Sequence, residues 1–341
     1  MNQTYSIPQL SELPRVDLCH TPTPLQHLKR LSEELGGPRI WVKRDDCTGL
    51  ATGGNKTRKL EYLLGDALAN DAQQVVTFGA VQSNHARQTA AACARLGLPC
   101  HLLLTRQVPS NEARYESGGN MLLNTLFGAT VTLFEPDQQN DIRDHLNTLK
   151  AAARTYVIPA GGSNATGALG YAQAAAELAS QCAAQAMDLK QIVLASSSSG
   201  TQAGLIAGMQ QLGIEVSITG VNVYHQDPQT LIDAVTQLVN DVQERFGLQQ
   251  HTQLQVAVNH AYLGEGYGQL NEQTREAIAL TAGLEGLLFD PVYSGKALTA
   301  LIDQIAVGSY QGLQDVVLIH TGGVQALNVY ESAFHNGSVC R

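Results

Sequence analysis

Short runs of apolar and β-branched residues recur along the chain, and segments with helical spacing of apolar positions separate them. The runs cover residues 40–43, 75–79, 100–105, 130–134, 156–159, 192–195, 218–223 and 316–320. Several runs are apolar throughout, which is typical of strands that helices cover on both faces. Helical spacing is clear in one segment, whose apolar positions are Leu60, Leu63, Leu64, Ala67 and Leu68. This alternation predicts an α/β fold with mostly parallel sheets.

The domain organisation is not marked by an internal repeat or by a low-complexity linker. Two glycine pairs, at 53–54 and 161–162, bracket a block of the predicted strand–helix units. We therefore expect a large domain formed by residues 1–56 and 161–341, and a small α/β domain, 57–160, inserted into it. In parallel sheets ligands bind beyond the carboxyl ends of the strands, so the loops after the strands are the first places to examine.

Composition narrows the classes of partner. Only 15% of the residues are charged, and 30 acidic against 21 basic residues give a net charge of −9. Nucleic acid and anionic membranes repel such a protein over most of its surface, so we expect neither as a partner. A local basic pocket remains compatible with this balance.

The chain also lacks the segments that mark membrane and secreted proteins. No stretch reaches the roughly 18 uncharged apolar residues that a membrane-spanning helix needs. Residues 1–10 have neither the basic start nor the apolar run of a secretory signal. The cysteines form no CxxC motif or Cys/His cluster, and they are Cys19, Cys47, Cys93, Cys100, Cys182 and Cys340. We expect reduced thiols in a cytoplasmic protein, and no metal site.

The segment 42–61, VKRDDCTGLATGGNKTRKLE, combines a strand end, a glycine-rich loop and a helix start. Gly53 and Gly54 permit positive φ and let a ligand approach the backbone. Asn55 is expected to cap the helix, which places Lys56 in its first turn. Because the helix N-terminus carries partial positive charge, this position lowers the proton affinity of the amine, as a carbonyl-attacking lysine requires. A solvated lysine on an exposed turn is the alternative interpretation.

A second candidate lies in 75–92, VVTFGAVQSNHARQTAAA, where an apolar strand leads into an alanine-rich helix that Ser83 or Asn84 caps. Free N–H groups at this helix start, together with the Ser83 hydroxyl, would bind a carboxylate. Asn84 offers both a donor and an acceptor to a ring hydroxyl or a carbonyl. An ordinary Ser/Asn cap without a ligand is the alternative interpretation.

The third candidate is the loop in IVLASSSSGTQAGL, at 192–205, which joins a buried strand to a helix. The loop residues are Ser196, Ser197, Ser198, Ser199, Gly200 and Thr201. Successive backbone N–H groups at a helix start, surrounded by hydroxyl donors, form a cradle for phosphate without a lysine or arginine. A flexible serine loop is out of place between a buried strand and an amphipathic helix, so we favour a phosphate site.

Further polar candidates follow the last predicted strands. They are Tyr293, Ser294, Thr321 and, in the sequence GEGYG, Tyr267. Each of them alone is typical of a structural residue, and Lys296 is expected at the surface of a helix start. Common nucleotide-binding and hydrolase motifs are missing, because the chain has no GxGxxG after a strand, no complete P-loop and no GxSxG.

Together these segments resemble the pyridoxal 5'-phosphate (PLP) enzymes of the tryptophan-synthase-β type, which is PLP fold type II. The resemblance covers residues 13–325, where GGNKTRKLE, QSNHARQTAA, GGSNATGALGY, SSGTQAGL, DPVYSGKA and HTGG occur in order. Within this type the chain is similar to the branch of 1-aminocyclopropane-1-carboxylate (ACC) deaminase, D-cysteine desulfhydrase and L-cysteate sulfo-lyase. The resemblance implies two open, mostly parallel sheets with flanking helices, PLP in the cleft and a homodimer.

The resemblance also implies which residues hold the cofactor. Lys56 would bond covalently to the cofactor aldehyde and then remove the α-proton of an amino-acid substrate. Asn84 would meet the 3-oxygen of the ring, and residues 196–201 would hold the phosphate. Thr321 would face the pyridine nitrogen, where a neutral hydroxyl does not enforce ring protonation and so suits elimination.

On the substrate side, the resemblance implies that Ser83 and the start of its helix bind the substrate carboxylate, while Tyr293 and Tyr267 line the site. The chain departs from the deaminase pattern at Ser294, where ACC deaminases carry the glutamate of VYEGK. Without that acid beside the ring nitrogen, opening of the cyclopropane ring loses its strongest electron sink. This departure argues against deaminase activity.

The resemblance therefore favours elimination from the β-carbon of a cysteine-type amino acid, giving pyruvate and ammonia. Residues 36–63 look more like sulfo-lyases than like enterobacterial desulfhydrases, so L-cysteate sulfo-lyase, which releases sulfite, is the first hypothesis. D-cysteine desulfhydrase, which releases hydrogen sulfide, is the alternative. A non-catalytic protein that binds PLP or an amino acid is a third hypothesis, against which Lys56 and the two ligand loops argue.

Overall fold

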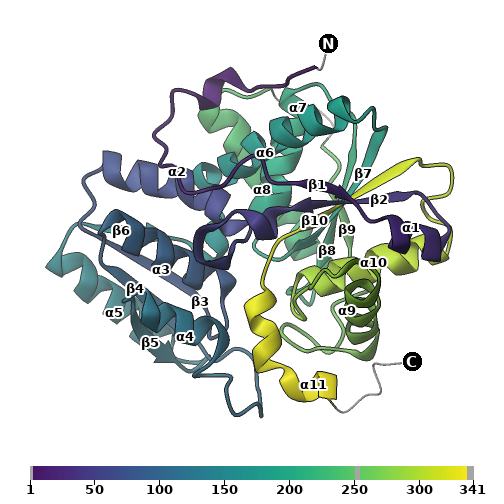
Figure 1. The fold of residues 1–341 in the computed structure, drawn as a ribbon. Coiled ribbons are helices and arrows are strands. Elements are labelled where there is room, and N and C mark those ends of the chain that lie inside the picture. The colour runs from purple at the N-terminus through teal and green to yellow at the C-terminus, as the bar shows by residue number, and fades with distance from the viewer. Residues whose placement is uncertain (1–2, 250–253, 336–341) are drawn as a thin grey trace.

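The structure is a computed structural model that describes residues 3–249 and 254–335. Over these residues the chain forms two β-sheets flanked by helices, and each sheet is mostly parallel (Figure 1). The predicted α/β class with two mostly parallel sheets is therefore confirmed. None of the helices in this part of the chain is long and apolar enough to cross a membrane.

The larger sheet contains β1 (Leu25–His27), β2 (Arg39–Arg44), β7 (Leu189–Ser196), β8 (Ser217–Asn222), β9 (Ala257–Asn259) and β10 (Asp315–His320). Its strand order is β1-β2-β10-β7-β8-β9, and every neighbouring pair is parallel except β1 with β2. β10 is buried at every position because it lies between β2 and β7 and has helices on both sides. Its continuous apolar run in the sequence reflects this central place.

The smaller sheet contains β3 (Gln74–Ala80), β4 (Cys100–Thr105), β5 (Thr130–Phe134) and β6 (Thr155–Ile158). Its order is β5-β4-β3-β6, and all pairs are parallel. These strands fall inside the segment 57–160 that the sequence predicts as an inserted unit. The division of the chain into one domain of 1–56 with 161–341 and another of 57–160 stays a prediction.

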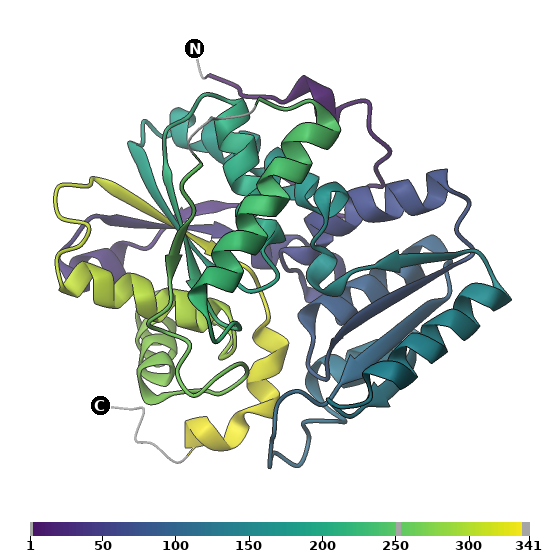
Figure 2. The ribbon, with the colours of Figure 1, turned by 180° about the vertical axis from the view of Figure 1, so that it is seen from behind.

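Helices cover both faces of the larger sheet (Figure 2). Those on one face are α6 (Ala165–Ala184), α7 (Gly200–Gln211) and α8 (Pro228–Phe246). Those on the other face are α1 (Lys29–Leu35), α9 (Glu272–Glu285) and α10 (Ser294–Ala306). The smaller sheet has α2 (Lys56–Ala69), α3 (Asn84–Leu96) and α4 (Gly119–Leu126) on one face and α5 (Gln139–Ala152) on the other. The short α11 (Glu331–His335) ends the described chain.

The ends of α8 show how local sequence sets these helices. Asp227 caps the helix by accepting from the N–H of Gln229, and Pro228 occupies the first helical position, where no N–H is needed. Gly247 ends the helix in a left-handed conformation (φ 62°). Between these signals the buried positions follow helical spacing, so one face of α8 packs against α7, α6 and the edge strand β9.

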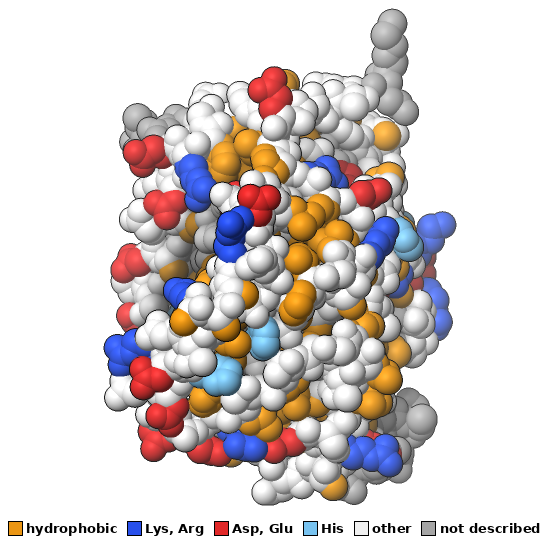
Figure 3. Space-filling model, turned by 90° about the vertical axis from the view of Figure 1, so that its left-hand side faces the viewer, with side chains coloured by type: hydrophobic (Ala, Val, Ile, Leu, Met, Phe, Trp, Pro, Cys, Tyr) orange, Lys and Arg blue, Asp and Glu red, His pale blue; other side chains and the backbone are white. Residues whose placement is uncertain are grey.

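One face of the molecule is formed by the smaller sheet and its helices, at the left of Figure 1. On this face lysine and arginine side chains are interspersed with aspartate and glutamate, and apolar side chains lie between them (Figure 3). Neither sign of charge gathers into one continuous area of this face.

The start of α2 is held by a buried cluster of charges where the helix meets β2 and α6. Arg58 donates to Asp45 through Nε (3.0 Å) and Nη2 (2.9 Å), and to Glu177 through Nη1 (3.0 Å) and Nη2 (2.9 Å). Lys43 also donates to Glu177, and Tyr171 donates to Asp45 at 2.5 Å. Burial by itself would raise the pKa of Asp45, but the charge and hydrogen bonds of Arg58 outweigh burial and lower that pKa. The carboxylate therefore stays ionised at neutral pH and anchors α2.

Replacement of this anchor is expected to destabilise the fold. Asp45→Asn leaves Arg58 without one of its buried anions, so the free energy of unfolding should fall by about 3–5 kcal/mol, measured by urea denaturation of the full-length protein. Asp71→Asn is the matched control, because Asp71 pairs with Arg154 at the surface, where the two side chains are 84% and 60% exposed. The Asp71→Asn substitution should lower the free energy of unfolding by only about 0–1 kcal/mol. Equal losses in the two variants would contradict the anchoring role.

Candidate active site

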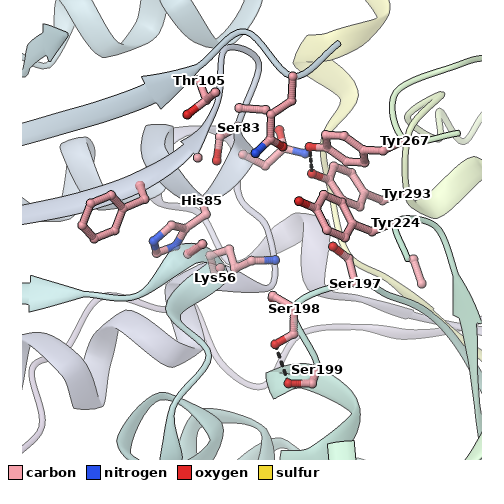
Figure 4. A pocket seen from close by; sticks show the side chains of 18 of the residues that line it. Lys56, Ser83, His85, Thr105, Ser197, Ser198, Ser199, Tyr224, Tyr267 and Tyr293 are labelled. Carbon is pink, nitrogen blue, oxygen red and sulfur yellow. Dashed lines mark hydrogen bonds between the residues drawn. The ribbon is translucent and has the colours of Figure 1, made fainter. Parts of the chain in front are cut away.

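A cavity of about 500 Å³ opens at the carboxyl ends of strands from both sheets (Figure 4). Its walls come from the ends of β3, β4 and β7 and from the segments that follow β6, β8 and β10. The predicted site residues that line it are Lys56, Ser83, Asn84, Ser196, Ser197, Ser198, Ser199, Thr201, Tyr267, Tyr293 and Thr321. Gly200 is the one predicted site residue that does not line it.

Lys56 reaches the cavity because a tight glycine turn precedes α2. At Gly53 (φ 78°) a Cβ would stand 1.8 Å from the backbone oxygen of Asp46, and at Gly54 (φ 138°) it would stand 2.5 Å from the side chain of Gln88. Neither position leaves room for a side chain, so this turn requires both glycines. Lys56 is then the first residue of α2, as predicted.

The predicted cap of α2 is wrong. Asn55 has helical backbone angles (φ −58°, ψ −25°), and its side chain caps no N–H group of the helix, because it is used elsewhere. Its Nδ2 donates to Thr201 Oγ1 at 2.9 Å, and its Oδ1 accepts from Lys56 Nζ at 3.0 Å. Asn55 thus connects the start of α2 to the start of α7 and orients the Lys56 amine.

The Lys56 amine loses its proton more readily than an ordinary lysine. Burial lowers its pKa to about 8, and the charge of Arg87 acts in the same direction, against an opposing effect of Asp290. The sequence predicts a low proton affinity from the charge of the helix N-terminus alone. The structure adds burial of the amine as a further cause. At neutral pH roughly a tenth of the amine is uncharged and able to attack a carbonyl.

The start of α3 presents two oriented polar side chains. Ser83 is the cap, because its Oγ accepts from the N–H of Ala86 at 3.1 Å, and its own hydroxyl proton remains available to a ligand. The Oδ1 atom of Asn84 accepts from Arg87 at 3.2 Å and from the amide of Asn120 at 2.9 Å. Since both neighbours are donors, the amide nitrogen of Asn84 is turned away from them, toward Gly323, at a residue that lines the cavity.

The serine loop ends in a helix start without a side-chain cap. Ser199 precedes α7 with a left-handed backbone (φ 68°), and its side chain accepts from no N–H group of the helix. N–H groups of the first turn of α7 are therefore available to an anionic ligand. Gly200 lies behind the loop, where its N–H donates to Ser163 Oγ at 3.2 Å. Among the described residues Ser196 Oγ has no hydrogen-bond partner.

Lys59 places a second lysine amine at this loop, and it was not predicted from the sequence. Its buried amine donates to Gly161 O at 3.1 Å and to Ser163 Oγ at 3.2 Å. A Cβ at Gly200 would stand 2.8 Å from Lys59 Nζ, so the amine lies directly beneath the serine loop. Burial lowers the pKa of Lys59, and no carboxylate in the described part of the chain pairs with it. Its spacing of three from Lys56, which puts both amines on one helix face, is the sequence signal for it.

The wall at the end of β10 holds Thr321. Its carbonyl accepts from the N–H of Asn55 at 3.1 Å, and its side chain lines the cavity. Ser294 does not line the cavity, because its Oγ donates to Asp290 Oδ1 at 2.5 Å. The Asp290 carboxylate also accepts from the N–H groups of Tyr293 (2.9 Å) and Ser294 (2.6 Å). Asp290 is thus occupied in holding the turn that begins α10.

Three tyrosines form another wall (Figure 4). The hydroxyls of Tyr267 and Tyr293 hydrogen-bond to each other, and the ring of Tyr224 packs edge-on against Tyr267 with centroids 5.0 Å apart. Burial raises the pKa of Tyr267 and of Tyr293, so both hydroxyls stay protonated at neutral pH. Tyr224 and His225 were missed from the sequence, although their place after the parallel strand β8 is a signal for them.

A metal centre is not formed by the part of the chain that the structure describes. Over residues 3–249 and 254–335 no three His, Cys, Asp or Glu side chains are placed to hold a metal ion. The free cysteines in these ranges are Cys19, Cys47, Cys93, Cys100 and Cys182, while Cys340 lies outside them.

Known proteins are similar to this chain over nearly its whole length. Residues 16–322 match the family described as Pyridoxal-phosphate dependent enzyme. A D-cysteine desulfhydrase of Klebsiella pneumoniae (strain 342) is 42% identical over 332 residues, which cover 95% of this chain and 98% of that protein. A D-cysteine desulfhydrase of Serratia proteamaculans (strain 568) is 44% identical over 327 residues, with coverage of 94% and 97%. The crystal structure of an ACC deaminase homologue shares 33% identity over 98% of both chains, with a TM-score of 0.85.

The residues of the cavity fit PLP, the cofactor of this family. An aldehyde needs an uncharged amine, which Lys56 offers, and a ring oxygen needs a donor such as the Asn84 amide. A phosphate group needs several donors and a cation, which the start of α7 and Lys59 supply. The clearest sign of fit is Lys59, since a buried amine that pairs with no carboxylate among the described residues is matched by a phosphate charge.

The low pKa of Lys56 predicts how the cofactor-free protein captures PLP. Only the neutral amine attacks the aldehyde, so the capture rate should rise with pH and level off just above pH 8, where most of the amine is deprotonated. An ordinary lysine, with a pKa of about 10.4, would keep gaining rate to higher pH. Stopped-flow absorbance over a pH series measures the rate, and Nα-acetyl-lysine corrects for titration of the cofactor itself. A corrected rate that still climbs tenfold per pH unit above roughly pH 9 would contradict this pKa.

Proposed function

The chain belongs to the pyridoxal-phosphate dependent enzymes, and we propose that it is a carbon–sulfur lyase that converts D-cysteine to pyruvate, ammonia and hydrogen sulfide. Support for the substrate comes from relatives named D-cysteine desulfhydrase, which are 42% and 44% identical over more than nine-tenths of this chain. The observation of the site that carries the proposal is the charge on the cavity walls. Lys56 is the only lysine or arginine among the described residues that line it.

This distribution of charge favours sulfide over sulfite as the leaving group. The sulfonate of L-cysteate stays ionised at physiological pH and needs a cation or several oriented donors. Lys56 is needed at the cofactor aldehyde and at the α-carbon, so the described walls offer no second cation for a sulfonate. A thiolate needs only one proton, which a neutral tyrosine supplies. The first hypothesis, L-cysteate sulfo-lyase on the strength of residues 36–63, therefore gives way to the desulfhydrase alternative.

ACC deaminase activity is also disfavoured. No aspartate or glutamate is among the described residues that line the cavity. At the position of the deaminase glutamate, the side chain of Ser294 is turned to Asp290 instead of the cavity. Without an acid at the cavity wall, the strong electron sink that ring opening requires is not supported.

Lys56 carries the proton transfer in the proposed reaction. Bound PLP supplies an aldehyde that links to amines and a ring that takes up the electron pair released at the substrate α-carbon. With a substrate amine held at the cofactor, Lys56 Nζ would accept the α-proton. Its pKa of about 8 leaves the free amine basic enough to take the proton and neutral often enough to do so. Asn55 Oδ1 accepts from Nζ at 3.0 Å and keeps the amine oriented.

The remaining predicted residues divide between the two ligands. We assign the phosphate to residues 196–201 with Lys59, and the ring oxygen to the Asn84 amide nitrogen. We assign the pyridine nitrogen to Thr321, whose hydroxyl is neutral, and the substrate carboxylate to Ser83 at the start of α3. The predicted homodimer and cytoplasmic location stay predictions.

Tyr293 and Tyr267 serve the β-carbon in this proposal. Their hydroxyls bond to each other, so one of the two protons is used within the pair and the other is free to be donated. When the carbon–sulfur bond breaks, its electron pair leaves on sulfur, and this proton neutralises the thiolate. The raised pKa of both tyrosines keeps the proton in place until that step.

The purified protein is expected to release sulfide and pyruvate in equal amounts from D-cysteine and no sulfite from L-cysteate. Colorimetric sulfide and sulfite assays and a coupled pyruvate assay measure the products. Lys56→Ala should keep the wild-type circular dichroism and form neither product, because it lacks the amine that the chemistry needs. Faster sulfite release from L-cysteate than sulfide release from D-cysteine would overturn the proposal.

Ser83 and Ser163 provide a matched pair of serine-to-alanine variants for the two ends of the site. Ser83→Ala should raise KM for D-cysteine by roughly 10- to 150-fold, which corresponds to about 1.5–3 kcal/mol for a hydrogen bond to a charged group. Its cofactor content should be unchanged. Ser163→Ala, next to Lys59 and Gly200, should instead lose cofactor on dialysis, measured by absorbance, with little change in KM. The reverse pattern would show that the carboxylate and phosphate ends are exchanged.

A further inference from the structure

The loop that carries Tyr267 has little structure of its own. Over residues 261–270 one backbone hydrogen bond, from the N–H of Gln269 to Gly266 O at 3.3 Å, joins two residues of the loop. Three glycines with positive φ alternate along it, and they are Gly264 (66°), Gly266 (139°) and Gly268 (77°). Because glycine is conformationally permissive, the loop needs ties from outside to hold the Tyr267 hydroxyl in one place.

Lys296 supplies two of these ties. The sequence suggested a surface lysine at a helix start, but the structure buries Lys296 completely in the first turn of α10. Its Nζ donates to Leu263 O at 2.6 Å and to Gly266 O at 3.1 Å. Burial lowers its pKa to about 8, and its hydrogen-bond partners in the described chain are neutral carbonyls. Burying an amine in this way costs stability, so packing alone does not account for it.

Tyr330 supplies a third tie on the other side of Tyr267. Its hydroxyl donates to Gly268 O at 2.7 Å, and its ring lies edge-on to Tyr115 with centroids 6.2 Å apart. The loop is therefore held at Gly266, just before Tyr267, and at Gly268, just after it. These ties leave the Tyr267 side chain directed at Tyr293 (Figure 4).

The first turn of α10 determines the positions of both Tyr293 and Tyr267. Tyr293 directly precedes α10, and Lys296 is three residues further along the same turn. We propose that Lys296 is a positioning residue, which holds the Tyr267 loop against α10 and so sets the Tyr267 hydroxyl against that of Tyr293. The consequence for catalysis rests on the role proposed above for this pair, whereas the restraint of the loop does not.

The kinetic test is a double-variant cycle on the PLP-loaded enzyme with D-cysteine. Lys296→Met removes both ties at similar side-chain length and should lower kcat by about 10- to 100-fold, because displacement of a reacting group by about 1 Å costs that much. Since Lys296 acts through Tyr267, adding Lys296→Met to Tyr267→Phe should slow the enzyme no more than about twofold further. Lys190→Met, at an exposed lysine, is the control and should match the wild type. If the loss of kcat in the double variant equals the product of the losses in the two single variants, the positioning role is wrong.

Hydrogen exchange of the PLP-loaded protein, followed by mass spectrometry, tests the restraint without a substrate. Peptides spanning 261–269 should exchange faster in Lys296→Met than in the wild type, while Lys190→Met should leave them unchanged. Tyr330→Phe removes the tie at Gly268 and should speed exchange in the same peptides, so it carries the test if Lys296→Met does not fold. Unchanged exchange in these variants would overturn the proposal. If the wild type does not act on D-cysteine, the proposed substrate is wrong, but the exchange rates still show whether Lys296 restrains the loop. Failure of the proposed function and failure of the positioning role are therefore distinguishable.

Discussion

The site depends on how the first two turns of α2 are held, because both lysines that define it project from them. Arg58 donates hydrogen bonds to the carboxylates of Asp45 and Glu177. Glu61, three residues later, accepts from the backbone N–H groups of residues 18 and 19 at 2.9 and 2.8 Å. These contacts fix the rotation of the helix about its axis. Lys56 and Lys59, also three apart, thereby project to the same side, Lys56 into the cavity and Lys59 beneath the serine loop. These are the ends that we assign to the aldehyde and to the phosphate of the cofactor.

The interior around the cavity carries basic side chains although the protein is acidic. Lys56 lines the cavity, Lys59 lies beneath the serine loop, and the fully buried Arg87 donates to the neutral oxygens of Asn84, at 3.2 Å, and Gly53, at 2.7 Å. Buried cations without directly paired carboxylates are costly, and an anionic ligand offsets that cost. A cofactor phosphate and a substrate carboxylate together supply such charges. The net charge of −9 describes the chain as a whole, and it carries no information about this interior.

Sequence alone predicts the features that depend on neighbouring residues. The strand runs, the glycine turn before Lys56, the Ser83 cap and the serine loop all follow from local periodicity and local backbone preference. The features that were missed depend on partners far along the chain. Asn55 leaves its capping role for Thr201, 146 positions away, and Lys296 is buried by carbonyls 33 and 30 positions away. A polar residue at a helix start is exposed by default, so only the tertiary fold reveals where such a side chain points.

The choice of reaction follows from which acids and bases the cavity offers. Asp290 is the carboxylate that affects the pKa of Lys56, yet its oxygens are taken up by N–H groups at the start of α10 and by the Ser294 hydroxyl. A carboxylate whose oxygens are bonded in this way does not turn to a ligand in the cavity. The groups left at the walls are one amine of low pKa, several hydroxyls and the imidazoles of His85 and His225. In the reaction that we propose, the amine would remove an α-proton and a hydroxyl would return a proton to a leaving thiolate, whereas opening of a cyclopropane would need a carboxylic acid, which the described cavity wall does not present.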